Sequence, residues 1–176
     1  DAGVDAVAIC GDIADDGFVE ELEETARIWF EVFPDNKAPD GRTVEKLFVA
    51  GNHDYIGWRY GRAKSIAPKV WGARATAAAH RISSDFGRNW SRIFKEPYSD
   101  VWMKTIKGYN FVGAHWCRHK AKAGCEMFNY DVAKFLAANA PAFDSNKPFF
   151  YFQHPHLKNT CYGPHVWGQD SGVTRS

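Results

Sequence analysis

The sequence predicts an α/β fold, and three observations support this class. Two short apolar runs, residues 5–10 and 46–50, each have the length and composition of a buried strand. The segment between them, residues 19–33, carries apolar side chains at helical spacing, so the three segments form one strand–helix–strand unit with parallel strands. A further apolar run at 147–153 predicts another strand late in the chain.

The first strand leads into the string Gly11-Asp12-Ile13-Ala14-Asp15, and a helix follows over 19–33. Four glutamates lie in the first turns of this helix, where negative charge interacts favourably with the helix dipole. Its apolar side chains recur every three or four residues and form the face expected to be buried. They are Leu22, Ala26, Trp29, Phe30 and Phe33. Residues 34–41 are rich in turn formers and connect the helix to the second strand.

The second strand ends at Gly51-Asn52-His53-Asp54. The next segment, residues 57–99, is rich in Trp, Arg and Ala and is long for a plain connection. We interpret it as an insertion or cap within the domain, with helical stretches at 63–67 and 73–82. Residues 101–106 and 109–115 flank Lys107-Gly108 and predict a hairpin. A helix is expected from residue 129 or 130 to 139, before the last strand at 147–153.

Composition limits the partners. The formal net charge is +1, so there is no basic field of the kind that binds nucleic acid, and no nucleic-acid partner is expected. Every apolar stretch is far shorter than the roughly 20 residues of a membrane span. Cys10 lies inside a strand and is expected in the core, whereas Cys117 and Cys125 flank a polar loop and form a candidate disulfide. Compartment and oligomeric state are not predicted.

Polar side chains follow both early strands at the point where each strand ends. Asp12 follows the first strand, and Asn52, His53 and Asp54 follow the second. Open α/β sheets place their active sites at the carboxyl ends of parallel strands. Carboxylate, amide and imidazole groups suit Mn, Fe and Zn alike, so the pattern predicts a divalent metal site. Simpler roles remain open, because Asp12 can cap the next helix and Asn52 can occupy a turn.

The order GD-x-x-D followed by GNHD resembles the calcineurin-like metallophosphoesterases, and His154-Pro155 after a strand resembles a later single-histidine motif of that family. The resemblance implies an αββα sandwich with mixed sheets and a binuclear centre of two divalent ions. It also implies hydrolysis of phosphate mono- or diesters by a metal-bridging hydroxide. The family's upstream D-x-H and downstream G-H-x-H motifs do not occur. We therefore expect residues 1–176 to be one incomplete domain, truncated at both ends.

By this resemblance, Asp12, Asn52 and His154 are the metal ligands, with Asp12 between the two ions. His53 is the catalytic residue that contacts a phosphoryl oxygen or protonates the leaving group. Asp54 is expected to orient or charge His53, or to position the loop.

Two further histidines are candidates for substrate binding. His156 shares a strand side with His154 by alternation, and His165 follows in a nearby loop. His115 and His119 form an H-x-x-x-H string without a helix pattern or a Glu, which does not favour zinc, although His115 at a strand end is a candidate to line the cleft.

The expected partner is a small phosphate ester or a phosphorylated substrate. The leading alternative is a noncatalytic member of the family that uses its fold as an interaction scaffold. A nuclease and a plain nucleotide-binding α/β domain are further alternatives, and the latter lacks a glycine-rich phosphate loop.

Overall fold

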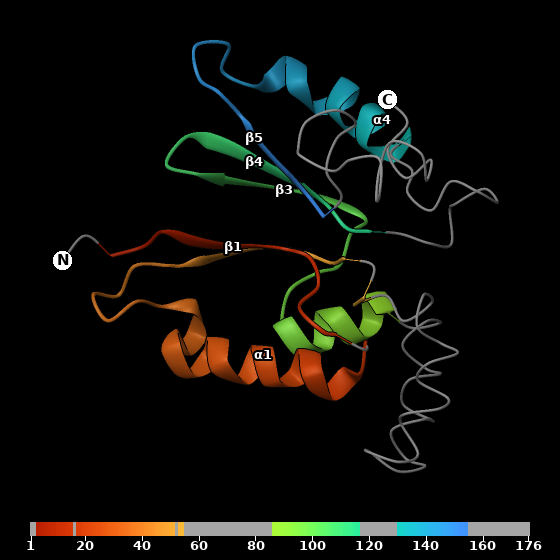
Figure 1. Cartoon of the computed structure of the whole chain (residues 1–176). Helices are drawn as coiled ribbons and strands as arrows, with labels where there is room; N and C mark the ends of the chain where they lie inside the picture. The colour runs from red at the N-terminus through yellow and green to blue at the C-terminus, as the bar shows by residue number, and fades with distance from the viewer. Residues whose placement is uncertain (1–2, 16, 52, 55–85, 117–129, 155–176) are drawn as a thin grey trace, which may run out of the picture.

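The computed structural model describes residues 3–15, 17–51, 53–54, 86–116 and 130–154. Its first sheet consists of two parallel strands, β1 (Ala6–Cys10) and β2 (Glu45–Val49). Ala6 pairs with Glu45 and Cys10 with Val49, so both strands end at the same edge of the sheet. The predicted strand–helix–strand unit is therefore confirmed, and its two polar strings begin side by side (Figure 1).

Helix α1 (Val19–Val32) connects the two strands and buries the predicted apolar face. Leu22, Ala26 and Trp29 are its buried side chains, whereas Phe30 and Phe33 are partly buried against the same core. The carboxylate of Glu21 accepts the backbone N–H of Phe18 at 2.8 Å, which satisfies one of the donors that a helix start leaves without a partner. The chain then passes through a short 3₁₀ turn, η1 (Pro34–Asn36), before it enters β2.

The second sheet has three strands in the order β3-β4-β5. Strand β3 (Val101–Ile106) and strand β4 (Tyr109–Ala114) form the predicted antiparallel hairpin. Its turn residues Lys107 and Gly108 have φ values of 50° and 78°, as a tight two-residue hairpin turn requires. Helix α4 (Tyr130–Asn139) and the 3₁₀ turn η3 (Ala140–Ala142) lead to β5 (Phe150–Gln153), which runs parallel to β4.

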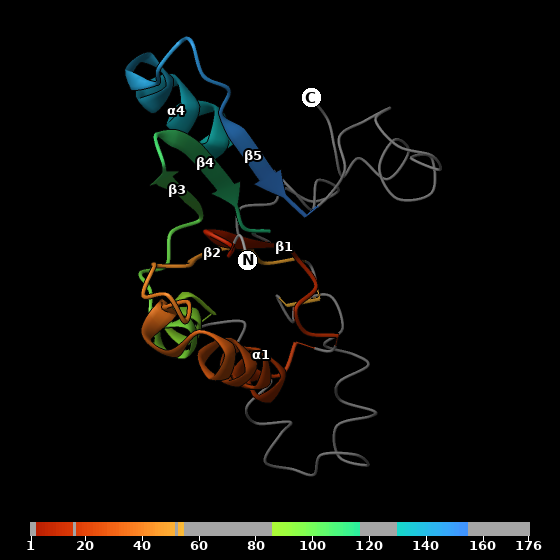
Figure 2. The same ribbon diagram turned by 90° about the vertical axis from the view of Figure 1, so that its left-hand side faces the viewer.

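A helix over residues 86–94 has no counterpart among the predicted elements. It lies within the segment interpreted as an insertion or cap, yet it packs with α1 against the first sheet (Figures 1 and 2). Its buried side chains belong to the same hydrophobic core as the buried face of α1. They are Phe86, Trp90, Ile93 and Phe94. Edge-on aromatic contact joins Phe94 to Phe48 of β2.

The two sheets contact each other through side chains of the hairpin. The indole Nε1 of Trp102 donates to the carbonyl oxygen of Phe48 at 3.1 Å, and Lys104 Nζ donates to the carbonyl oxygen of Lys46 at 2.6 Å. In both views the two sheets lie between the helices: α1 covers the outer side of the β1-β2 sheet, and α4 covers the outer side of the β3-β4-β5 sheet (Figures 1 and 2). The observed fold is α/β with two small sheets, which confirms the predicted class.

Cys10 was expected in the core but is exposed, because in the described part of the chain β1 pairs along one edge only and none of its residues is fully buried. The expected helical stretches at 63–67 and 73–82 and the candidate disulfide of Cys117 with Cys125 lie outside the described residues. Among the described helices, none is long and apolar enough to span a membrane.

Candidate metal and phosphoester site

The candidate site begins where β1 ends. Gly11 and Asp12 both have positive φ values, 93° and 53°, so the chain turns sharply as it leaves the strand. Glycine adopts this conformation freely, and aspartate tolerates it better than most residues. The turn brings the carboxylate of Asp12 to the edge at which β2 and β5 also end.

The imidazole of His154, directly after β5, meets this carboxylate. Its Nε2 lies 3.3 Å from Oδ1 of Asp12, and its Nδ1 lies 3.0 Å from the carbonyl oxygen of Cys10. A carbonyl oxygen only accepts hydrogen bonds, so Nδ1 carries the proton and Nε2 is directed at Asp12. Histidines that bind metals use the same arrangement, with one ring nitrogen held by a carbonyl and the other turned to the ion.

Two glycines allow this close approach. A Cβ atom added at Gly11 would overlap the imidazole of His154. A Cβ atom added at Gly51 would overlap the carboxylate of Asp12 and would lie 2.9 Å from Cε1 of His154. Any other residue at either position would force Asp12 and His154 out of their places.

His53 is linked to two carboxylates of the first string. Its backbone N–H donates to Oδ1 of Asp12 at 3.1 Å, and its Nδ1 lies 3.3 Å from Oδ1 of Asp15. The same Asp12 oxygen therefore faces both His53 and His154. No local sequence pattern pairs Asp15 with His53, because the two residues are 38 positions apart in the chain.

Asp54 is completely buried and joins the two loops. Its Oδ1 accepts the N–H of Ala14 at 2.6 Å, and its Oδ2 accepts the N–H of Gly51 at 2.7 Å. Burial raises the pKa of the Asp54 carboxyl to about 6, although the hydrogen bonds from Ala14 and Gly51 oppose that rise. Both carboxylate oxygens thus accept hydrogen bonds from the backbone, as expected if Asp54 positions the loop.

The described residues bring together Asp12, His53, Asp54 and His154 from three strand ends. Asn52, His156 and His165 lie outside the described residues. In the described part of the chain, no group of three or more His, Cys, Asp and Glu side chains is arranged to hold a metal ion. Asp12 and His154 nevertheless suit one, because an anionic oxygen and an imidazole nitrogen lie 3.3 Å apart where two glycines allow their close approach.

Together, these features define an α/β protein with a carboxylate and an imidazole gathered where strands of two sheets end. The sequence model of the calcineurin-like phosphoesterase family matches residues 1–145. The chain belongs to the calcineurin-like phosphoesterase family, whose members are generally phosphoester hydrolases and typically bind divalent metal ions. No curated protein and no solved structure matches the chain.

Proposed function

We propose that this protein hydrolyses phosphate mono- or diesters with two divalent metal ions, of Mn, Fe or Zn, held at the ends of β1, β2 and β5. The observation that carries the proposal is the contact between His154 and Asp12. Nε2 of His154 and Oδ1 of Asp12 lie 3.3 Å apart and can share either a proton or a divalent cation. Membership in a family that typically binds divalent ions favours the cation.

In this proposal Asp12, Asn52 and His154 are metal ligands. The ions, when bound, neutralise charge on the phosphoryl oxygens and activate water for attack. The chain itself holds the ligands in place. The Cys10 carbonyl fixes the tautomer of His154, and the N–H of His53 orients the Asp12 carboxylate.

His53 serves the leaving group in this proposal, because imidazole exchanges protons near neutral pH. The contact between His53 Nδ1 and Asp15 supports a positioning role for Asp15, since a carboxylate at one ring nitrogen directs the other toward substrate. Asp54 acts through the backbone of the two loops. His156 and His165 remain proposed substrate contacts.

The fold of this domain is proposed to be an αββα sandwich with mixed sheets. The order of the described elements supports this, because α1 and the 86–94 helix lie outside the first sheet and α4 lies outside the second (Figures 1 and 2). The second sheet is mixed, with one antiparallel and one parallel pair.

Elemental analysis, combined with hydrolysis of p-nitrophenyl phosphate and of bis(p-nitrophenyl) phosphate, tests the proposed function. We expect about two metal ions per chain and turnover that disappears with a chelator and returns with Mn, Fe or Zn. The preferred ester then separates a phosphatase from a phosphodiesterase. A protein that stays inactive and metal-free after incubation with each of these ions would refute the proposal and favour the noncatalytic scaffold.

His53→Ala separates the catalytic role from metal binding. We expect turnover of the preferred aryl ester to fall about 10²-fold or more, with the metal content unchanged. Glu20→Gln, which changes an exposed carboxylate on α1, is the control and should match the wild type in both measurements. An unchanged rate in His53→Ala would show that His53 does not serve the leaving group.

A further inference from the structure

The residue before the GNHD string is held by the second sheet through both of its backbone polar groups. The N–H of Ala50 donates to Nδ1 of His115 at 2.9 Å, and the carbonyl oxygen of Ala50 accepts the N–H of Trp116 at 2.9 Å. His115 and Trp116 directly follow β4, and Ala50 directly follows β2. The end of β4 therefore fixes the end of β2 one residue before Gly51.

The hydrogen bond from Ala50 requires His115 to be neutral at Nδ1, because a backbone N–H only donates. Burial lowers the pKa of His115 to about 3, and the residue is only 4% exposed. Two charged groups face it from the β3 side: Asp100 raises its pKa and Lys104 lowers it. The ring thus remains a neutral acceptor throughout the pH range in which phosphoesterases are assayed.

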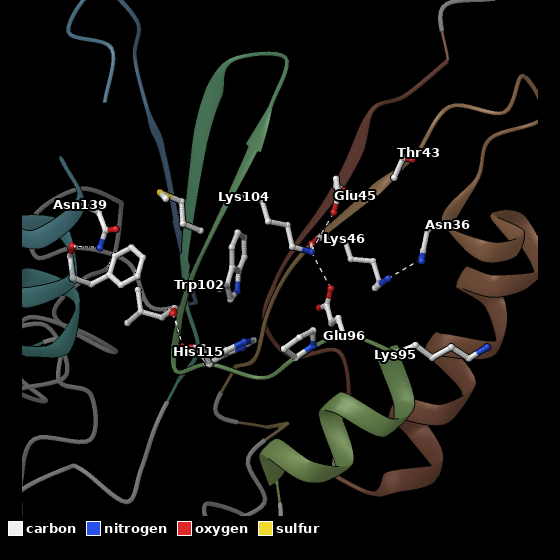
Figure 3. Close-up of a pocket in the computed structure, with 15 residues that line it drawn as sticks. Asn36, Thr43, Glu45, Lys46, Lys95, Glu96, Trp102, Lys104, His115 and Asn139 are labelled. Carbon is white, nitrogen blue, oxygen red and sulfur yellow. Dashed lines mark hydrogen bonds and ion pairs between the residues drawn. The ribbon is translucent and has the colours of Figure 1, made fainter. Parts of the chain in front are cut away.

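Aromatic side chains set the plane of this ring. Tyr98 stacks on it with ring centres 4.9 Å apart and an angle of 21°, and Trp90 meets it edge-on at 4.7 Å. A cavity of about 660 Å³ borders the imidazole, with Trp102, Lys104 and Glu96 among its other lining residues (Figure 3). An acceptor smaller than imidazole would not overpack these neighbours.

We propose that His115 is a positioning residue for the Gly51–Asp54 turn, acting from the second sheet through Ala50. This inference rests on the proposed function, because the turn carries Asn52 and His53. Ala50 is completely buried, so loss of the acceptor leaves its N–H without a partner and drives the turn to shift. A shift of about 1 Å at a catalytic group can cost about 10²-fold in rate.

Two variants at one position test the proposal. His115→Ala removes the acceptor, whereas His115→Asn keeps an acceptor oxygen close to the place of Nδ1. In His115→Ala we expect amide exchange at Ala50 to accelerate about tenfold or more, and the Kd for Mn²⁺ by calorimetry to rise about tenfold. His115→Asn should restore both values to within about threefold of the wild type.

Val112→Ala is the matched control, because Val112 is completely buried on β4 but packs with Val101 and Val132 in the second core cluster. It should lower the free energy of global unfolding. Amide exchange at Ala50 should accelerate by no more than this loss of global stability accounts for. The proposal is overturned if Ala50 exchange in His115→Ala stays at the wild-type rate, or if Val112→Ala reproduces the local acceleration. Wild-type protein that binds none of Mn, Fe and Zn and hydrolyses neither ester refutes the proposed function alone, and Ala50 exchange still decides the role of His115.

Discussion

Acid destabilisation through His115 is the prediction that the structure supports with the clearest magnitude. The pKa of this histidine falls from an ordinary 6.5 to about 3 on folding, because burial penalises its charged form. Between these values the unfolded chain binds a proton that the folded chain does not, so the free energy of unfolding falls as the pH falls below 6.5. A pH of about 5 is about 1.5 units below the pKa of the unfolded chain. At that pH the free energy of unfolding is lower by about 2 kcal/mol because of this proton.

The measurement is urea unfolding of the wild type and of His115→Asn at about pH 7.5 and pH 5. We expect the wild type to lose about 2 kcal/mol more than the variant over this interval, because the variant has no imidazole at this position. Asp54 contributes with the opposite sign, since its raised pKa of about 6 makes stability fall as the pH rises from 3.8 to 6. That contribution is common to both proteins and cancels in the difference. Equal losses in the two proteins would refute the assignment of His115 as a buried neutral histidine.

Two further predictions concern the core and the site. Leu22→Ala, at a completely buried position of α1, should lower the free energy of unfolding by about 2–5 kcal/mol in urea titrations, and a loss under about 1 kcal/mol would contradict the packing of α1 on the first sheet. Gly51→Ala should raise the calorimetric Kd for Mn²⁺ by about tenfold or more, because the added Cβ overlaps the Asp12 carboxylate, and wild-type affinity would argue against a metal between Asp12 and His154.

Much of the fold was predictable because its elements have strong local patterns. Strand β2 ends in the apolar residues Leu47, Phe48 and Val49. Helix α1 places Leu22, Ala26 and Trp29 at helical spacing on its buried face. The 86–94 helix was missed although Phe86, Trp90, Ile93 and Phe94 also follow helical spacing. Its surroundings in the sequence, which are rich in Trp, Arg and Ala, favoured an insertion. Its identity as a core helix depends on packing against Phe48, which is distant in the chain.

For the candidate site, the sequence predicted which residues follow strand ends but not which of them contact one another. The sequence places Asp12 and His154 after strands, but the 3.3 Å contact between them depends on how the two sheets meet. The hydrogen bonds of the Cys10 carbonyl and the Ala50 N–H could not be predicted from residue types, because every residue except proline carries both backbone groups. His115 was noted as a candidate to line the cleft, and its role as an acceptor for Ala50 required the structure.

One oxygen atom connects the parts of the site. Oδ1 of Asp12 accepts the backbone N–H of His53 and faces Nε2 of His154, so the ends of β1, β2 and β5 meet at a single carboxylate. The backbone around it is fixed independently, by Asp54 between the two loops and by His115 from β4. A cation bound at Asp12 would therefore enter a preorganised site, and its binding would stabilise the contact between the two sheets as well as the loops.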